Sequence, residues 1–280
     1  MKIQIISGEQ IQELCDCYIG TEYDFSFNPR ISSQKDKQIY LDDLCNDLSG
    51  FKYIFCYTHL FQTHFKRIFE ILKTIRNPFV LVCHNSDGCF QKKYEQLFNL
   101  SCLNCIFTQN NMTRHDRIFH LPIGIGNSQW KHGNIGLLME MRQNISKDRF
   151  IFFNFNIETN RDKRLVCYTE IKKKGIQFLN RFSNQREYLQ ELSKYQFAIC
   201  PEGHGPDCHR IYECLYLNVI PIMVRSHLTD YLSQHLQIIV LERWSELDID
   251  KCIYNPEIFK SMEMLSMEKI KSDIHNMVHK

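Results

Sequence analysis

The sequence lacks long apolar runs and a strong excess of either charge. No stretch approaches the roughly 18 apolar residues of a transmembrane helix, and residues 1–10 combine one short apolar run with polar residues, so neither a membrane anchor nor a signal peptide is expected. The 34 Lys and Arg residues nearly balance the 32 Asp and Glu residues, which indicates neither a nucleic-acid-binding surface nor a polybasic membrane patch. We therefore expect a soluble, cytoplasmic protein with no nucleic-acid or membrane partner.

Of two motifs of common nucleotide and sugar enzymes, one is missing and the other occurs only in an unsuitable place. No Gly-x-Gly-x-x-Gly follows the first strand-like run, which disfavours a sugar-phosphate epimerase or another dinucleotide enzyme. The Asp-x-Asp spacing of a metal-dependent transferase occurs only as Asp248-Ile-Asp250, in a polar region that we interpret as solvated surface.

Thirteen cysteines are present, but their number is odd and their spacing is irregular, which argues against a disulfide framework. Several lie inside apolar runs, among them Cys56, Cys83, Cys200 and Cys214. Buried free thiols in a reducing compartment explain this pattern.

Strand-like runs alternate with helical patterns along the chain, and this rhythm predicts an α/β fold. The expected elements of the first half are strands Lys2–Ile6, Tyr53–Tyr57, Phe79–Cys83 and Cys105–Thr108, and helices Leu60–Ile75 and Lys92–Phe98. After a polar stretch, Glu140–Arg149, the second series comprises strand Phe150–Phe155, helix Arg161–Lys174, strand Gln177–Leu179 and helix Gln185–Lys194. We expect domains at 1–145 and 146–256, followed by an amphipathic helix over 257–280.

The most informative segment is Tyr195–Val224, in which a glycine-rich turn and a short helix separate two strands. Phe197–Cys200 and Val219–Val224 are short apolar runs typical of buried strands. Asp207 is expected to cap a helix over Cys208–Leu217. The N-terminus of that helix would present unpaired backbone N–H groups and a positive dipole end to an anion, and a diphosphate suits such a site.

The polar residues of this helix are candidate nucleotide ligands. Arg210 lies near the helix N-terminus, within reach of a phosphate oxygen, and Glu213 lies one turn deeper, where a carboxylate accepts hydrogen bonds from two ribose hydroxyls. Glu213 shares a helix face with His209, Tyr212 and Tyr216, and we interpret this face as a pocket wall. The alternative is a capped surface helix with a His209–Glu213 pair.

A second polar cluster, His84-Asn-Ser-Asp-Gly88, directly follows the buried strand Phe79–Cys83. Ligands of open α/β sheets bind at the carboxyl ends of the strands. An Asp or a His at this edge can act as a general base toward a hydroxyl group. Asp87 and His84 are therefore the candidate catalytic bases.

Three further residues near this edge are candidate ligands of the molecule that carries this hydroxyl, which we call the acceptor: Asn85, Ser86 and His59. The alternative for the cluster is a turn in which Asn85 and Asp87 satisfy the backbone. The alternative for His59 is a packed residue at the start of a helix.

Pro201-Glu-Gly-His-Gly-Pro-Asp-Cys-His-Arg-Ile-Tyr-Glu213 and the residues up to Ile222 resemble the nucleotide-sugar segment of exostosin-like glycosyltransferases, including soluble forms from bacteria and from large DNA viruses of algae. The resemblance is close over about 30 residues and extends more weakly from about His84 to Glu242. Asn218 departs from the pattern, which usually has glycine there. Because asparagine tolerates the left-handed conformation, we expect the helix end to be preserved.

The resemblance implies a GT-B fold, in which two Rossmann-like domains face a cleft and the C-terminal helix crosses back to the first domain. It also implies a UDP-sugar donor, no obligatory metal or other cofactor, and inverting transfer. Within the family pattern, the His-Arg pair and the downstream Glu contact the donor nucleotide, and these correspond to His209, Arg210 and Glu213.

Two further segments gain meaning from the resemblance. Arg161 and Arg164 lie on one side of the helix that follows Asn154-Phe-Asn, where they add positive charge against the diphosphate; an exposed, solvated helix start is the alternative. The loop Leu121–Trp130 resembles an interdomain loop of soluble relatives, which adds Asn127 and Trp130 to the acceptor-binding candidates. The complete donor-binding set is Glu202, Gly203, Gly205, Asp207, His209, Arg210, Glu213, Arg164 and Arg161.

These inferences predict a glycosyltransferase that moves a sugar from UDP to a glycan hydroxyl by direct displacement, while cationic groups stabilise the leaving diphosphate. Related enzymes use xylose, galactose, arabinose, glucuronic acid or N-acetylglucosamine, and xylose is our first choice. A non-catalytic accessory protein that binds a nucleotide sugar or a glycan is the alternative, and release of UDP from UDP-sugars distinguishes the two.

Overall fold

The structure is a computed structural model that describes residues 4–43, 48–143, 145–257, 259 and 265–278. The chain divides into two compact units: unit 1 comprises Met1–Trp130 and Leu265–Lys280, and unit 2 comprises Lys131–Met264. Both units are mixed α/β structures built on parallel sheets. Unit 2 begins before the expected limit at residue 146, because helix α5 (Ile135–Arg142) contacts α7 (Gln185–Leu192) and α8 (His209–Tyr216).

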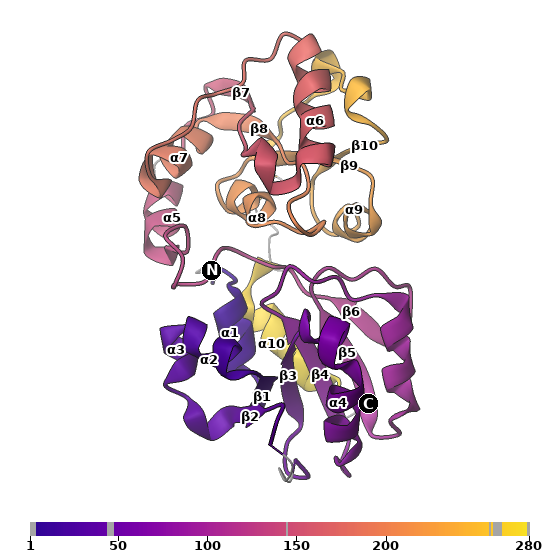
Figure 1. The fold of residues 1–280 in the computed structure, drawn as a ribbon. Coiled ribbons are helices and arrows are strands. Elements are labelled where there is room, and N and C mark those ends of the chain that lie inside the picture. The colour runs from indigo at the N-terminus through magenta and orange to yellow at the C-terminus, as the bar shows by residue number, and fades with distance from the viewer. Residues whose placement is uncertain (1–3, 44–47, 144, 258, 260–264, 279–280) are drawn as a thin grey trace. The chain divides into compact units, whose positions relative to one another are not determined.

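Unit 1 contains a parallel sheet with the strand order β2-β1-β3-β4-β5-β6 among the described residues (Figure 1). Its strands are β1 (Cys17–Gly20), β2 (Gln38–Tyr40), β3 (Tyr53–Tyr57), β4 (Phe79–His84), β5 (Leu103–Thr108) and β6 (Ile118–His120). β4 is an inner strand of the sheet. All its side chains are buried, as expected of a strand that is covered on both faces. Tyr57 pairs with His84, so the ends of β3 and β4 lie side by side.

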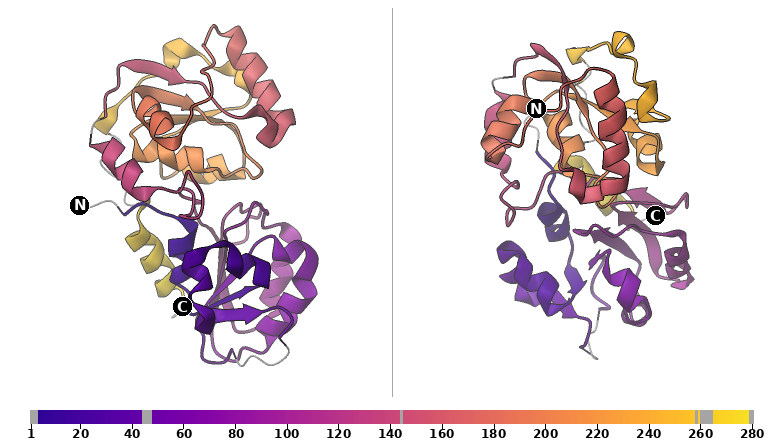
Figure 2. Two further views of the ribbon diagram at one scale, coloured as in Figure 1. Left: turned by 60° about the vertical axis from the view of Figure 1, so that its left-hand side comes forward. Right: turned by 45° about the horizontal axis from the view of Figure 1, so that its top comes forward.

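The helices of unit 1 are α1 (Gly8–Glu13), α2 (Glu22–Phe27), α3 (Pro29–Ser32), α4 (Leu60–Lys73) and α10 (Met267–Asn276), with 3₁₀ helices at Lys35–Lys37 and Lys92–Asn99. α10 lies beside α1, on the side of the sheet away from α4 (Figure 1, Figure 2). It is anchored where the Met267 N–H donates to the Gln4 carbonyl, 3.3 Å away.

The strand order of unit 1 reverses between β1 and β3. β1 leads to β2 on one side, whereas its other neighbour, β3, leads to β4 in the opposite direction. The connections that leave β1 and β3 therefore diverge at their carboxyl ends. Such a topological switch point is where open α/β sheets bind ligands.

Unit 2 contains a smaller parallel sheet with the strand order β10-β9-β8-β7 among the residues that the structure describes. Its strands are β7 (Arg149–Phe152), β8 (Tyr195–Ile199), β9 (Ile220–Val224) and β10 (Ile239–Leu241). Besides α5, α7 and α8, its helices are α6 (Arg161–Lys173) and α9 (His227–Leu232), with 3₁₀ helices at Ile157–Asn160, Trp244–Glu246 and Ile249–Lys251. Figure 2 shows these elements from two further directions.

A partly buried lysine joins three elements of unit 2. Lys147 Nζ donates to the backbone carbonyls of Ser193, Tyr195 and Leu217, each 2.8 Å away. Ser193 follows α7, Tyr195 begins β8 and Leu217 follows α8. All three N–H donors of the ammonium group thus bind carbonyls that lie at the ends of helices or strands.

Several sequence-based expectations for the elements are confirmed. Tyr53–Tyr57 is a strand with the expected limits, and the helices expected at Leu60, Arg161 and Gln185 begin at those residues. Asn218 adopts a left-handed conformation with φ of 56°, as expected at the end of α8. Cys56, Cys83, Cys200 and Cys214 are free and buried.

Other expectations for the elements are wrong. Gln177–Leu179 is not a strand, although the Leu179 N–H donates to the Phe153 carbonyl at 2.8 Å. Of the expected strand Lys2–Ile6, residues 4–6 are not strand and the others lie outside the described residues. The helix expected over Lys92–Phe98 is a 3₁₀ helix, and the helical part described within 257–280 is α10. No helix of the described residues combines the length and apolarity needed to span a membrane.

Candidate functional site

The glycine-rich turn of unit 2 follows β8 and is closed by backbone hydrogen bonds. The Gly203 N–H donates to the Gly205 carbonyl at 3.1 Å, and Asn160 Nδ2 donates to the Gly203 carbonyl at 2.7 Å. Glu202 pairs with Lys163 at the surface. The turn is therefore held by its own contacts and by the segment before α6.

The start of α8 differs from the sequence-based expectation. The N-cap is Cys208, and the Asp207 carboxylate instead accepts a hydrogen bond from the Tyr212 hydroxyl at 2.9 Å. Tyr212 and Tyr216 are fully buried, so the face expected to form a pocket wall is mostly packed into the core. Glu213 is the member of that face that reaches a cavity.

The arginines expected to bind the diphosphate are engaged inside unit 2. Arg210 Nη1 donates to the Asn154 carbonyl, and its guanidinium carbon lies 5.4 Å from the centre of the Tyr188 ring. Arg164 is buried and donates to the carbonyls of Glu202 and Asn156, at 2.8 and 2.7 Å. Arg161 is exposed and pairs with Glu158, which matches the alternative of a solvated helix start.

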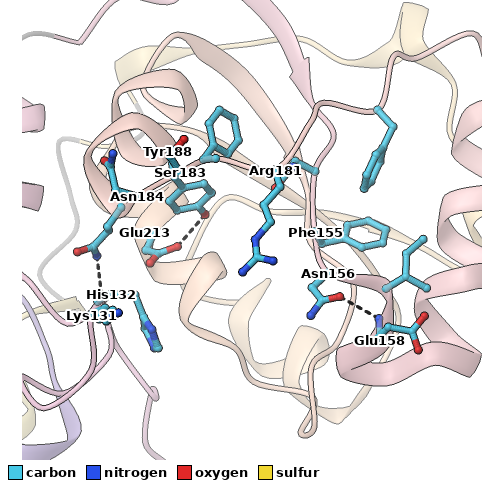
Figure 3. A pocket seen from close by; sticks show the side chains of 15 residues that line it. Lys131, His132, Phe155, Asn156, Glu158, Arg181, Ser183, Asn184, Tyr188 and Glu213 are labelled. Atoms are coloured by element: carbon cyan, nitrogen blue, oxygen red, sulfur yellow. Dashed lines mark hydrogen bonds between the residues drawn. The ribbon is translucent and has the colours of Figure 1, made fainter.

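A cavity of about 640 Å³ lies in unit 2, in the size range of small-molecule sites (Figure 3). Four aromatic side chains supply apolar surface: Phe155, Phe178, Phe182 and Tyr188. The remaining lining residues are Lys131, His132, Asn154, Asn156, Ile157, Glu158, Arg181, Ser183, Asn184, Gln185 and Glu213. The segment after β7, the segment before α7 and the middle of α8 thus converge on one space.

Glu213 presents a carboxylate to this cavity. Its residue is only 6% exposed, and Oε2 accepts a hydrogen bond from the Tyr188 hydroxyl at 2.8 Å. Oε1 accepts no hydrogen bond from the described residues. A nearly buried carboxylate with an unused acceptor oxygen favours a ligand that donates hydrogen bonds.

Arg181 is the functional candidate that the sequence did not reveal. It extends into the cavity, between the Tyr188–Glu213 pair and Asn156 (Figure 3). Among the described residues, it makes no hydrogen bond or ion pair. It lies in an irregular segment that we expected to separate a strand from a helix, and no motif marks it. Only the folded path of residues 175–184 brings its guanidinium to the cavity.

Two histidines border the same region. The rings of His132 and His209 lie 5.7 Å apart. Burial and, to a lesser degree, the proximity of His209 lower the pKa of His132, while Glu213 opposes this shift. His209 thus lies close to the cavity, although it does not line it.

In unit 1, His84 is completely buried at the end of β4. Its Nδ1 lies 3.2 Å from Asn85 Oδ1 and its Nε2 lies 3.2 Å from the Pro122 carbonyl. His120, at the end of β6, is also buried, and burial together with the nearby His84 lowers the pKa of His120 to about 3. Both ring nitrogens of His84 thus lie within hydrogen-bonding distance of oxygens of the protein.

Asn85 is the centre of the hydrogen-bond network around His84. It has a φ of 56°, and its Nδ2 donates to the Gly8 carbonyl at 3.2 Å and to Gln12 Oε1 at 2.8 Å. Its Oδ1 accepts from Asn127 Nδ2 at 3.1 Å. Asn127 Oδ1 in turn accepts from the Glu9 N–H at 2.9 Å. The network thus binds α1 to the loops that follow β4 and β6.

The other candidates of unit 1 lie in different settings. Asp87 is exposed, and the Gly88 N–H donates to the Ser86 hydroxyl at 3.0 Å, whereas the turn considered from the sequence assigned this role to Asn85 and Asp87. Trp130 is 45% exposed and packs on Phe27, with ring centres 4.9 Å apart. The structure brings His84, Asn85 and Asn127 together, and the Trp130 N–H donates to the Asn127 carbonyl at 3.0 Å.

Comparison of the sequence with models of known protein families found no match, and comparison with curated proteins found none either.

Proposed function

We propose that the chain is an exostosin-like glycosyltransferase that binds a UDP-sugar in the cavity of unit 2 and moves the sugar to a glycan hydroxyl. The proposed arrangement is that of a GT-B enzyme, in which unit 1 supplies the acceptor side and unit 2 the donor side. Xylose remains the first choice of sugar. The resemblance of Pro201–Ile222 to nucleotide-sugar segments is one support for this proposal.

The observation that carries the proposal is that Glu213 and Arg181 line one cavity. A nucleoside diphosphate needs apolar surface for its base, acceptors for its ribose hydroxyls and a cation for its phosphates. The aromatic rings, the unused Oε1 of Glu213 and the Arg181 guanidinium match these three needs. Arg181 therefore takes the phosphate-binding role that we expected of Arg161 and Arg164.

The proposed reaction is an inverting displacement with a base from unit 1. His84 is not carried forward as this base, because it is fully buried and both its ring nitrogens lie within hydrogen-bonding distance of other oxygens. Asp87 is exposed and remains a candidate on that ground. The preorganised positive charge near the diphosphate stabilises the leaving group.

Titration calorimetry with UDP and with uridine tests the binding step. Arg181→Ala should weaken UDP binding by about 1.5–3 kcal/mol, the usual contribution of hydrogen bonds to charged groups, and should hardly affect uridine. Glu213→Gln should weaken the binding of both UDP and uridine. Arg186→Ala is the matched control, because Arg186 is exposed and paired with Glu140. If wild type and both cavity variants bound UDP with equal affinity, the proposal that UDP binds in this cavity would be wrong.

Release of UDP from UDP-sugars separates the enzyme from an accessory binding protein. Activity should persist in excess EDTA, because side-chain cations are proposed to stabilise the diphosphate. Loss of activity in EDTA and recovery with Mn²⁺ or Mg²⁺ would contradict that part of the scheme. UDP binding without any release of UDP from a donor would favour the accessory protein.

A further inference from the structure

A histidine and an aspartate meet at the topological switch point of unit 1. His59 follows β3 at the start of α4, and Asp24 lies in α2, directly after β1. His59 Nε2 lies 3.1 Å from Asp24 Oδ1. The side chain of His59 is 43% exposed, whereas that of Asp24 is 4% exposed. The pair thus combines a buried carboxylate with an accessible imidazole.

Asp24 is held rigidly and in its ionised form. Its Oδ2 accepts hydrogen bonds from the Thr21 N–H at 2.9 Å and from the Thr21 hydroxyl at 2.6 Å. Burial raises the pKa of Asp24, but the hydrogen bonds from His59 and Thr21 outweigh it and leave the pKa below its usual value. An ionised carboxylate at Nε2 keeps the proton on that nitrogen and leaves Nδ1 of His59 as an acceptor.

The surroundings of His59 leave Nδ1 available. Nδ1 has no hydrogen-bonding partner among the described residues. Besides Asp24, Tyr57 of β3 is a titratable residue close to His59 among the described residues, and its ring centre lies 6.0 Å from that of His59. A Cβ at Gly88 would lie 3.1 Å from the His59 backbone nitrogen, so the missing side chain lets this segment pack against His59.

We propose that His59 is the general base of the transfer reaction and that Asp24 is its positioning residue. This assignment rests on the proposed function. The acceptor hydroxyl gives its proton to His59 Nδ1 while its oxygen bonds to the anomeric carbon. The bond from that carbon to the diphosphate oxygen breaks, and its electron pair leaves with UDP. Asp24 stabilises the imidazolium that forms, as carboxylates do in other histidine-based sites.

The test measures UDP release from UDP-xylose, with water as the acceptor, in wild type and single variants. His59→Gln should lower kcat by about 10²-fold or more, the effect of losing a general base, and leave UDP affinity unchanged. Imidazole should restore part of the activity of His59→Ala. His64→Gln, an exposed histidine of the same helix, is the matched control.

Asp24→Asn should lower kcat and move the acid limb of the pH profile to lower pH, because the imidazolium loses its counter-charge. A purely structural role for Asp24 would leave that limb in place. Melting curves show whether each variant is folded, and His59→Gln decides the assignment if Asp24→Asn does not fold.

The outcomes separate this inference from the proposed function. Wild-type turnover in His59→Gln, or loss of transfer in Asp87→Asn alone, overturns the assignment while UDP binding stands. Failure of the wild type to release UDP from UDP-xylose, UDP-galactose and UDP-N-acetylglucosamine also overturns it. Failure of the wild type to bind UDP in calorimetry overturns the proposed function itself.

Discussion

Polar side chains gather at the carboxyl ends of parallel strands in unit 1 and around a cavity in unit 2, and the two clusters use their hydrogen-bonding groups differently. In unit 1, His84, Asn85 and Asn127 bond to one another and to the segment around α1. In unit 2, Glu213 and Arg181 turn hydrogen-bonding groups toward a cavity. Polar residues after a strand therefore do not identify a ligand site by themselves. The useful sign is hydrogen-bonding capacity that the protein leaves unused.

The largest expected effect in this comparison comes from Asn85→Ala, which removes the centre of the unit 1 network. It loses the hydrogen bonds to Gly8 and Gln12 and places alanine at a φ of 56°, so the free energy of unfolding should fall by about 3 kcal/mol. Asn218→Ala is the control, because Asn218 has the same φ without such a network. It should cost about 1 kcal/mol in urea unfolding. Equal losses would mean that the Asn85 side chain adds nothing.

Gly8→Ala tests by steric crowding how firmly the Asn85 network of unit 1 is packed. A Cβ at Gly8 would overlap the Asn85 amide oxygen and lie 2.8 Å from His84 Nδ1, so overpacking should cost about 2 kcal/mol. A Cβ at Gly136, near the start of α5, would lie 3.5 Å from Asn134 Oδ1, an ordinary van der Waals contact, so Gly136→Ala should be neutral or slightly stabilising. Urea unfolding measures both. A stable Gly8→Ala protein would show that the network is easily rearranged.

The free energy of unfolding should depend on pH because His120, beside His84 in unit 1, is buried. The pKa of His120 is about 3 in the folded chain, whereas an ordinary histidine has a pKa near 6.5, so the unfolded chain binds more protons between these values. The free energy of unfolding contributed by His120 should rise with pH in this window and fall by about 1.4 kcal/mol for each unit of acidification.

Urea unfolding at pH 6.5, 5.5 and 4.5 measures this slope. His132 of unit 2, whose pKa burial also lowers, contributes with the same sign, so the informative quantity is the slope of wild type minus that of His120→Gln. An unchanged slope in His120→Gln would mean that His120 is not the neutral buried group.

The smallest expected effect concerns the cavity of unit 2. Tyr188→Phe removes the hydrogen bond to Glu213 Oε2, so UDP binding should weaken by about 1 kcal/mol while the fold is retained. Tyr195→Phe is the control, since its hydroxyl lies by Glu191 and not in the cavity. Calorimetry should separate the two variants, and identical affinities would argue that Tyr188 does not orient the carboxylate.

The sequence predicted the parts of the fold that long, uniform patterns specify. β4 and β8 contain the apolar runs Phe79–Cys83 and Phe197–Ile199, and α4 has helical periodicity over many residues. The short strands β1, β2, β6 and β10 were not predicted, because three or four residues do not establish a period and sheet pairing decides them.

The candidate site was predictable only in part, for a related reason. Glu213 was identified from its place in a helix after a glycine-rich turn, and it does line the cavity. The direction of an arginine depends on its tertiary surroundings, so the sequence did not show that Arg164 and Arg210 bind backbone carbonyls while Arg181 faces the cavity. The His59–Asp24 pair was missed because it joins residues from two separate strand connections.

The three hydrogen bonds of Lys147 have a consequence for the cavity. Tyr188 belongs to α7 and Glu213 to α8, and their hydrogen bond fixes one wall of the cavity. Two of the three carbonyls that Lys147 binds, those of Ser193 and Leu217, follow the C-termini of these two helices, where backbone dipoles carry negative charge. A single ammonium group therefore ties the ends of both helices together, and the spacing of two cavity-lining side chains is set by a residue that does not line the cavity.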